Sequence, residues 1–102
     1  MVRLLTDSEV EKGLKKFTGW KRDGKFITKT YSFETFLEGI AFIDVVAAVA
    51  EKEEHHPDIH VRYTEVTLSL QTHDHGGVTE WDLELAGAIE RAASPRETKK
   101  GL

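Results

Sequence analysis

The chain has 102 residues, 39% of them hydrophobic and 31% charged, which predicts one globular domain with a single modest core. It contains no cysteine, so disulfide and thiolate chemistry are excluded within these residues. The formal net charge is −4 with acids and bases interleaved, so no basic stripe could neutralise a phosphate backbone, and direct binding of nucleic acid is not expected.

No apolar run approaches the ~18 residues that a membrane-spanning helix needs. The opening stretch "MVRLLTDSEVEK" has only two consecutive leucines before polar residues begin, which is too short for a signal-peptide core. We therefore expect a cytoplasmic protein that does not enter a membrane.

The first predicted helix begins at "LTDSEV", where Thr6 can cap the helix and Glu9 follows three residues later. This spacing is that of a capping box, in which each side chain bonds the other residue's backbone N–H. Gly19 is expected to end the segment. The apolar stripe at helical spacing consists of Val10, Leu14 and Phe17.

The stretch "GWKRDGKFITKTYSF" predicts a β-hairpin. Asp23-Gly24 is a two-residue turn signal, because a type I′ turn needs positive φ at both central positions. The two strands are then expected at about residues 20–22 and 25–31.

A long second helix is predicted over residues 34–52, preceded by Ser32 or Phe33. Pro57 disfavours helical geometry at His56, so the helix should end near that residue. One face of this helix is expected to consist of Phe36, Ile40, Ile43, Ala47 and Ala50.

After Pro57, "DIHVRYTEVTLSLQTH" predicts two strands with a bend near residues 62–64. Val66, Leu68 and Leu70 alternate with polar residues and should face the core. His73 lies an even number of residues after the polar residues of this strand, so it should point to the same polar face if the strand continues that far.

"HDHGGVTEWD" predicts a turn into a last helix, because Gly76 and Gly77 permit unusual backbone angles. Thr79 can cap this helix, with Asp82 at its third position. The predicted order α-β-β-α-β-β-α indicates a single α+β domain with a largely antiparallel sheet. The polar tail over residues 94–102 is expected to fray.

The five histidines fall into two clusters, one at the end of the second helix and one where a strand meets the glycine turn. Such segment ends commonly carry functional groups. Imidazole exchanges protons near neutral pH, so general acid–base catalysis is the first hypothesis. Glu51 lies four residues before His55, and on a continuing helix its carboxylate would orient that ring. The histidines are His55, His56, His60, His73 and His75.

Two alternatives remain open. His73 and His75 would point the same way on a strand and could bind a metal with His55 or His56, but the usual zinc spacings are absent. Histidines can also be plain solvated loop residues. That interpretation is favoured for His60 and is as good as the functional one for His75.

Two motifs together resemble the pterin-4a-carbinolamine dehydratase family: "EKEEHHPDI" and "TLSLQTHDHGGVTEWDLELAGAIE". The resemblance covers the chain from Thr6 to Ala93. The matching positions are Glu51, His55-His56-Pro57, Tyr63, Val66, Thr72-His73, Gly77, Thr79, Asp82 and Leu85-Ala86, with Gly19-Trp20 and its hairpin.

The resemblance implies one antiparallel four-stranded sheet with three helices, assembled as a homodimer or homotetramer. It implies a hydro-lyase that converts 4a-hydroxytetrahydropterin to quinonoid dihydropterin and water in tetrahydropterin recycling. No metal or organic cofactor is implied.

The resemblance also implies roles for single residues. His55 and His73 would be the acid–base pair, and His56 would mainly position the substrate. Glu51 would support His55, and Asp82 is either a helix cap or a catalytic group. The remaining pocket lining would be Pro57, Thr72, Asp74 and His75.

The chain departs from the family pattern at three places. Ile59 stands where the family commonly has tryptophan, His75 occupies a variable turn, and Trp81 replaces a long polar residue of animal members and could mark an oligomer contact or a pocket edge. The substrate preference therefore stays open. Two other functions remain: a non-catalytic module that stabilises a transcription-factor dimer, and a molybdopterin-related role for the same pocket.

Overall fold

The computed structural model describes residues 2–100, with side chains described as far as residue 93. The predicted tail over residues 94–102 therefore lies outside the described side chains. In chain order the elements are α1 (Asp7–Leu14), β1 (Lys21–Asp23), β2 (Phe26–Ser32), α2 (Phe36–Glu53), β3 (Asp58–Arg62), β4 (Glu65–Leu70), the 3-10 helix η1 (His73–His75) and α3 (Glu80–Lys100).

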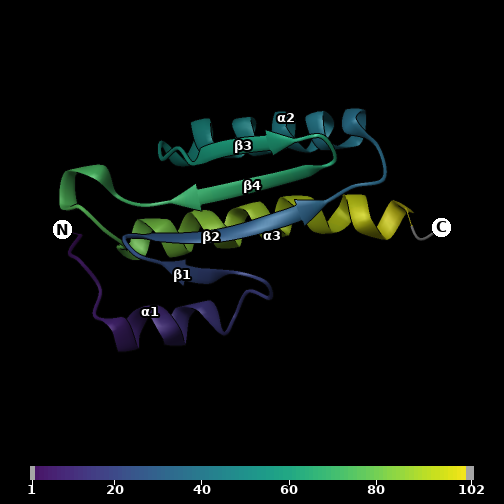
Figure 1. Ribbon diagram of the computed structural model, residues 1–102. Helices are drawn as coiled ribbons and strands as arrows, with labels where there is room; N and C mark the ends of the chain where they lie inside the picture. Colours follow the sequence, from purple (N-terminus) through teal and green to yellow (C-terminus); the bar gives the residue numbers. More distant parts are fainter. Residues whose placement is uncertain (1, 101–102) are drawn as a thin grey trace.

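The four strands form one antiparallel sheet in the order β1-β2-β4-β3, so β1 and β3 are its edges. Figure 1 shows the strands side by side, with α2 and α3 running along one face of the sheet. This arrangement confirms the predicted α+β domain of three helices and four antiparallel strands.

Strand alternation decides which side of the sheet is buried. Val66, Leu68 and Leu70 of β4 are fully buried, as predicted, and they pair with β2 residues whose side chains face the same helices. The opposite face is polar and carries hydroxyl pairs such as Thr30 with Thr67. No helix in the described part of the chain is long and apolar enough to cross a membrane.

The hairpin between β1 and β2 forms one residue later than predicted. Asp23 pairs with Phe26, so the two turn residues are Gly24 and Lys25 rather than Asp23 and Gly24. Gly24 has φ of +59°, whereas Lys25 is not among the described residues with positive φ. Positive φ at the first turn position alone is the pattern of a type II′ turn, which also suits the twist of a hairpin.

The predicted capping box of α1 is present. The Thr6 hydroxyl accepts from the Glu9 backbone N–H at 3.1 Å, and the Glu9 carboxylate accepts from the Thr6 N–H at 2.8 Å. The helix ends at Leu14, before the expected stop, and the chain turns through to Gly19, whose φ is +90°.

The long helix α2 differs from prediction at its start and in its buried face. Thr35 caps it in a second capping box with Glu38, which was not predicted. Phe36 of the predicted face is 46% exposed. Between its first residue and Ala50 this helix has only two charged positions, Glu38 and Asp44, so spacing alone could not select the face. The buried residues are Gly39, Phe42, Val46 and Ala50.

Candidate active site

Both histidine clusters meet at one end of the molecule. The end of α2, the start of β3, η1 and the start of α3 converge there, at the left in Figure 1. Between them lies a cavity of about 380 Å³, called the histidine hollow below. It is lined by Glu54, His55, His56, Pro57, Asp58, Thr72, His73, Asp74 and Trp81.

The chain reaches this hollow through an abrupt end to α2. Glu54 adopts the left-handed conformation, with φ of +57° and ψ of +37°, although it is not a glycine. Such a residue stops a helix and redirects the chain. Pro57 follows, and β3 begins at Asp58. His55 and His56 are therefore presented by an extended connection and not by a helical face.

His55 is held by a buried carboxylate from α3. Its Nε2 lies 2.6 Å from Oδ1 of Asp82, whose side chain is 0% exposed, while the imidazole itself is 16% exposed. A carboxylate oxygen accepts, so Nε2 carries the proton in this bond. Nδ1 is then the nitrogen of a neutral His55 ring that keeps a lone pair.

Asp82 is itself fixed by two further donors. The Thr72 hydroxyl and the Thr79 backbone N–H each donate to its Oδ2 at 2.9 Å. The second bond is the expected capping interaction at the start of α3, and the positive end of the helix dipole also favours a carboxylate there. Asp82 is thus both a helix cap and the partner of His55, because its two oxygens have different donors.

His56 has a different and more exposed partner. Its Nε2 lies 2.7 Å from Oε2 of Glu51, with side chains 60% and 79% exposed. The expected contact between Glu51 and His55 is wrong. That expectation assumed that α2 continues through His55, whereas the left-handed Glu54 ends the helix first and turns the next residue, His56, toward Glu51.

His73 lies in η1 and not on an extended β4, because the strand ends at Leu70. It is exposed and lines the histidine hollow. The amide nitrogen of Gln71 lies 3.2 Å from its Nδ1. An amide NH₂ can only donate, so Nδ1 accepts, and the proton of a neutral His73 ring is on Nε2.

The other predicted site residues divide into two groups. Pro57, Thr72 and Asp74 line the hollow, although the hydroxyl of Thr72 is used by Asp82. Glu51 and His75 do not line it. The Nδ1 atom of His75 is buried without a hydrogen-bond partner among the described residues, and the ring lies edge-on to Trp81 at a centroid distance of 6.3 Å.

The geometry does not support the alternative in which His73 and His75 bind a metal. His73 and His75 lie in a 3-10 turn, so the strand alternation that would point both rings the same way is absent. Among the residues whose side chains are described, no group of three His, Cys, Asp or Glu is placed to hold a metal ion.

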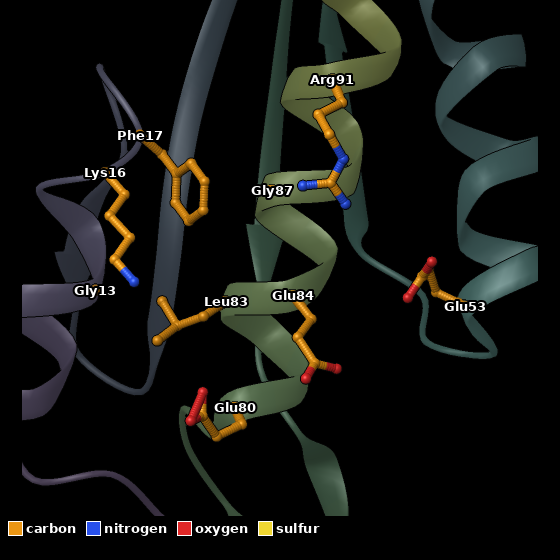
Figure 2. Close-up of a pocket in the computed structure, with 9 residues that line it drawn as sticks. All are labelled: Gly13, Lys16, Phe17, Glu53, Glu80, Leu83, Glu84, Gly87 and Arg91. Carbon is orange, nitrogen blue, oxygen red and sulfur yellow. The ribbon is translucent and has the colours of Figure 1, made fainter.

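A second cavity of about 430 Å³ lies between α1 and α3. Figure 2 shows Lys16 and Phe17 on one side of α3, with Leu83 extending toward them, and Glu53 at the end of α2 on the other side. No histidine lines it. It is slightly larger than the histidine hollow but has no histidine pair that could exchange protons near neutral pH, so the histidine hollow is the candidate active site.

Known proteins resemble this chain along nearly its whole length. The family model for pterin 4 alpha carbinolamine dehydratase matches residues 3–92. A protein of Roseiflexus castenholzii with a provisional pterin-4-alpha-carbinolamine dehydratase name is 49% identical over 90 residues, covering 88% of this chain and 97% of its own. A protein of Sulfurisphaera tokodaii with the same provisional name is 39% identical over 89 residues, covering 87% and 96%.

Two solved structures share the fold. A transcriptional coactivator/pterin dehydratase from Brucella melitensis superposes with a TM-score of 0.83 at 33% identity, covering 89% of this chain and 99% of its own. A pterin dehydratase-like protein described as a RuBisCO assembly factor of the alpha-carboxysome gives 0.58 at 24% identity, covering 72% and 86%, which is a likeness of fold alone. With the family match, these likenesses show that the chain belongs to the pterin-4a-carbinolamine dehydratase family.

Proposed function

We propose that this protein dehydrates a 4a-hydroxytetrahydropterin to the quinonoid dihydropterin in tetrahydropterin recycling. One observation carries the proposal beyond family membership. The histidine hollow is lined by two imidazoles whose partners occupy opposite ring nitrogens: Asp82 binds Nε2–H of His55 and leaves the lone pair on Nδ1, whereas Gln71 binds Nδ1 of His73 and leaves Nε2–H. That is the complement of a base and an acid that a dehydration needs.

The proposed step balances with these two groups alone. His73 in its doubly protonated form gives the Nε2 proton to the 4a-hydroxyl, with the Gln71 amide turned so that its oxygen accepts from Nδ1–H, and the C4a–O bond breaks to release water. Nδ1 of His55 takes the proton from the neighbouring ring nitrogen, and the electrons of that N–H bond form the new C=N double bond. Exchange with solvent returns both rings to their starting forms. No metal or organic cofactor takes part in the proposed step.

The remaining residues of the site bind and orient. His56 is exposed at the rim and is proposed to position the substrate, with Glu51 holding its ring. Asp82 positions His55 and keeps its proton on Nε2. Pro57 and Asp74 line the pocket, and Thr72 acts mainly by donating a hydrogen bond to Asp82. His75 has no proposed part in the reaction.

The direct test is stopped-flow absorbance of 4a-hydroxytetrahydropterin generated in situ. The wild type should be fast, and the His55→Ala/His73→Ala variant should be slow while still folded by circular dichroism. We expect His73→Ala alone to lower the rate by roughly 10²-fold, the usual scale for losing a positioned acid or base. His60→Ala is the matched control, because His60 lies on β3 and does not line the hollow.

The same variants separate dehydration from a protein-binding role like the coactivation named for the Brucella protein. A binding surface would tolerate loss of the histidines, whereas the proposed reaction would not. A wild type no faster than buffer would overturn the dehydratase proposal, and would leave a binding role or a different pterin in this pocket.

We also propose that the chain works as a homodimer or homotetramer. The support is the exposure of large apolar side chains at two places, Phe36 and Leu37 on α2 and Val61 and Tyr63 at the edge strand β3. Light scattering during size-exclusion chromatography should give a mass of two or four chains, and a monomer mass at micromolar concentration would contradict this.

A further inference from the structure

The wall of the histidine hollow contains one aromatic side chain that no catalytic role uses. Trp81 is 48% exposed and stands on the first turn of α3, immediately before Asp82. Its backbone N–H donates to the Thr79 hydroxyl at 3.2 Å, so the helix cap fixes its position. Large apolar side chains that stay exposed in a concave site commonly bind ligands.

Trp81 also separates two cavities. A side hollow of about 260 Å³, lined by Glu53, Glu54, His55, Trp81 and Glu84, shares three of these residues with the histidine hollow. The shared residues are Glu54, His55 and Trp81. The indole and the His55 ring therefore line both cavities, and the two ring centroids are 6.3 Å apart.

The two tryptophans of the chain have different environments. Trp20 is buried, and its indole N–H donates to Glu90 at 3.1 Å. No hydrogen bond from the Trp81 indole N–H to another described residue is present, and its aromatic neighbours among these residues are His55, tilted by 59°, and His75, at 79°, each with its ring centroid 6.3 Å away. Trp20 is a core residue, whereas the surface of Trp81 is left for a ligand.

We propose that Trp81 is the stacking surface for the flat heteroaromatic ring of the substrate. This proposal rests on the proposed dehydratase function, since a pterin is such a ring. The other lining groups are acids, imidazoles, a threonine and Pro57, so Trp81 supplies most of the flat apolar area in the histidine hollow. A stacked ring would lie within reach of His55 beside it, and the face of Trp81 would fix the plane in which the ring binds.

Stacking should act on binding rather than on proton transfer. Loss of an aromatic platform beneath a nucleobase weakens binding by about tenfold or more, and a pterin offers a π-face of similar size. Trp81→Leu should therefore raise the Kd and KM about tenfold with kcat within about threefold. Trp81→Phe should restore both to within about threefold, because it keeps a flat ring.

The experiment is isothermal titration with 7,8-dihydrobiopterin, a stable dihydropterin that is not turned over, on wild type, Trp81→Leu and Trp81→Phe. Phe26→Leu is the matched control, since Phe26 is an aromatic residue at the start of β2 and does not line the histidine hollow. Its Kd should equal that of the wild type. Circular dichroism melting checks that each variant is folded.

A second signal comes from fluorescence. In a Trp20→Phe background only Trp81 emits, and saturating dihydropterin should quench that emission with the same Kd. Stacking would be overturned if Trp81→Leu bound the dihydropterin as tightly as the wild type, or if Trp81→Phe bound it as weakly as Trp81→Leu. The dehydratase proposal would still stand in either case if the wild type dehydrates the substrate. A wild type that neither binds the dihydropterin nor dehydrates the substrate would overturn both.

Discussion

Asp82 and Glu90 are two carboxylates of the same helix, α3, about 12 Å apart along its axis. Asp82 accepts from Thr72, the Thr79 backbone and His55. Glu90 accepts hydrogen bonds from three side chains: Trp20, which directly precedes β1, and Lys29 and Tyr31 of β2.

The difference lies in the partner and not in the carboxylate. An imidazole exchanges its proton near neutral pH, whereas lysine, tyrosine and tryptophan side chains as classes do not. The imidazole of His55 also lines the histidine hollow, whereas none of the three partners of Glu90 lines it. A buried carboxylate, Asp82, therefore fixes the imidazole proposed as the base at one end of α3, and a partly buried one, Glu90, fastens the helix to the sheet toward the other end.

The largest expected effect is that of Asp82→Asn on catalysis. If the amide oxygen keeps the bonds from Thr72 and Thr79, the amide NH₂ faces His55 and makes its Nε2 an acceptor. The His55 proton then moves to Nδ1 and removes the lone pair proposed as the base. We expect kcat to fall by roughly 10²-fold in the stopped-flow assay, with the fold retained. An unchanged kcat would make Asp82 a helix cap alone.

Glu90→Gln should give the converse result. We expect kcat within about twofold of wild type and a free energy of unfolding lower by about 1–3 kcal/mol, measured by urea denaturation, because donors around Glu90 lose a charged partner. A loss of activity without a loss of stability would contradict the contrast between the two carboxylates.

The pH dependence of that stability difference follows from the direction of the shift. Partial burial raises the pKa of Glu90, but hydrogen bonds from Lys29, Tyr31 and Trp20 outweigh it, so the pKa lies below the ordinary value of 4.5. The ionised form stabilises the fold at and above neutral pH, and this contribution is lost as pH falls below about 4.5 and through the lower folded pKa. The gap between wild type and Glu90→Gln should therefore narrow in acid.

His56→Ala should have a smaller effect of a different kind. His56 is 60% exposed at the rim, so its loss should raise KM about tenfold or less and leave kcat nearly unchanged. Steady-state kinetics separates the two parameters. A defect confined to kcat would place His56 in the chemistry instead.

Glu51→Gln should have the smallest effect. The pair of Glu51 and His56 is exposed to solvent, and exposed ion pairs contribute about 0–1 kcal/mol. We expect a change of less than about twofold in KM, best measured at low salt. A loss of activity as large as that of Asp82→Asn would contradict this, because the exposed histidine–carboxylate pair would then matter as much as the buried one.

Much of the fold could be predicted because its signals are local. The capping box of α1 lies within four residues, and the alternation along β4 needs no knowledge of the rest of the chain. The buried face of α2 could not be predicted, because the helix is apolar on most sides. The turn after β1 moved by one residue because Gly24 fits the first position of a different turn.

The site was less predictable because it depends on contacts between distant segments. The spacing predicted a contact between Glu51 and His55. The left-handed residue Glu54 ends the helix first, so Glu51 contacts His56 instead. Asp82 lies 27 residues from His55 in sequence, and only the packing of α2 against α3 brings them together. The sequence did mark Asp82 as a cap and Trp81 as a departure from the family pattern, without deciding the role of either.

A double-mutant cycle on the dehydration rate tests the central claim most directly, using wild type, His55→Ala, Asp82→Asn and the double variant. If Asp82 acts through His55, Asp82→Asn should cost roughly 10²-fold in the native background and less than about twofold once His55 is alanine. If the two losses multiply in the double variant, Asp82 acts independently of His55, and the assignment of the buried carboxylate as the group that prepares the base is wrong.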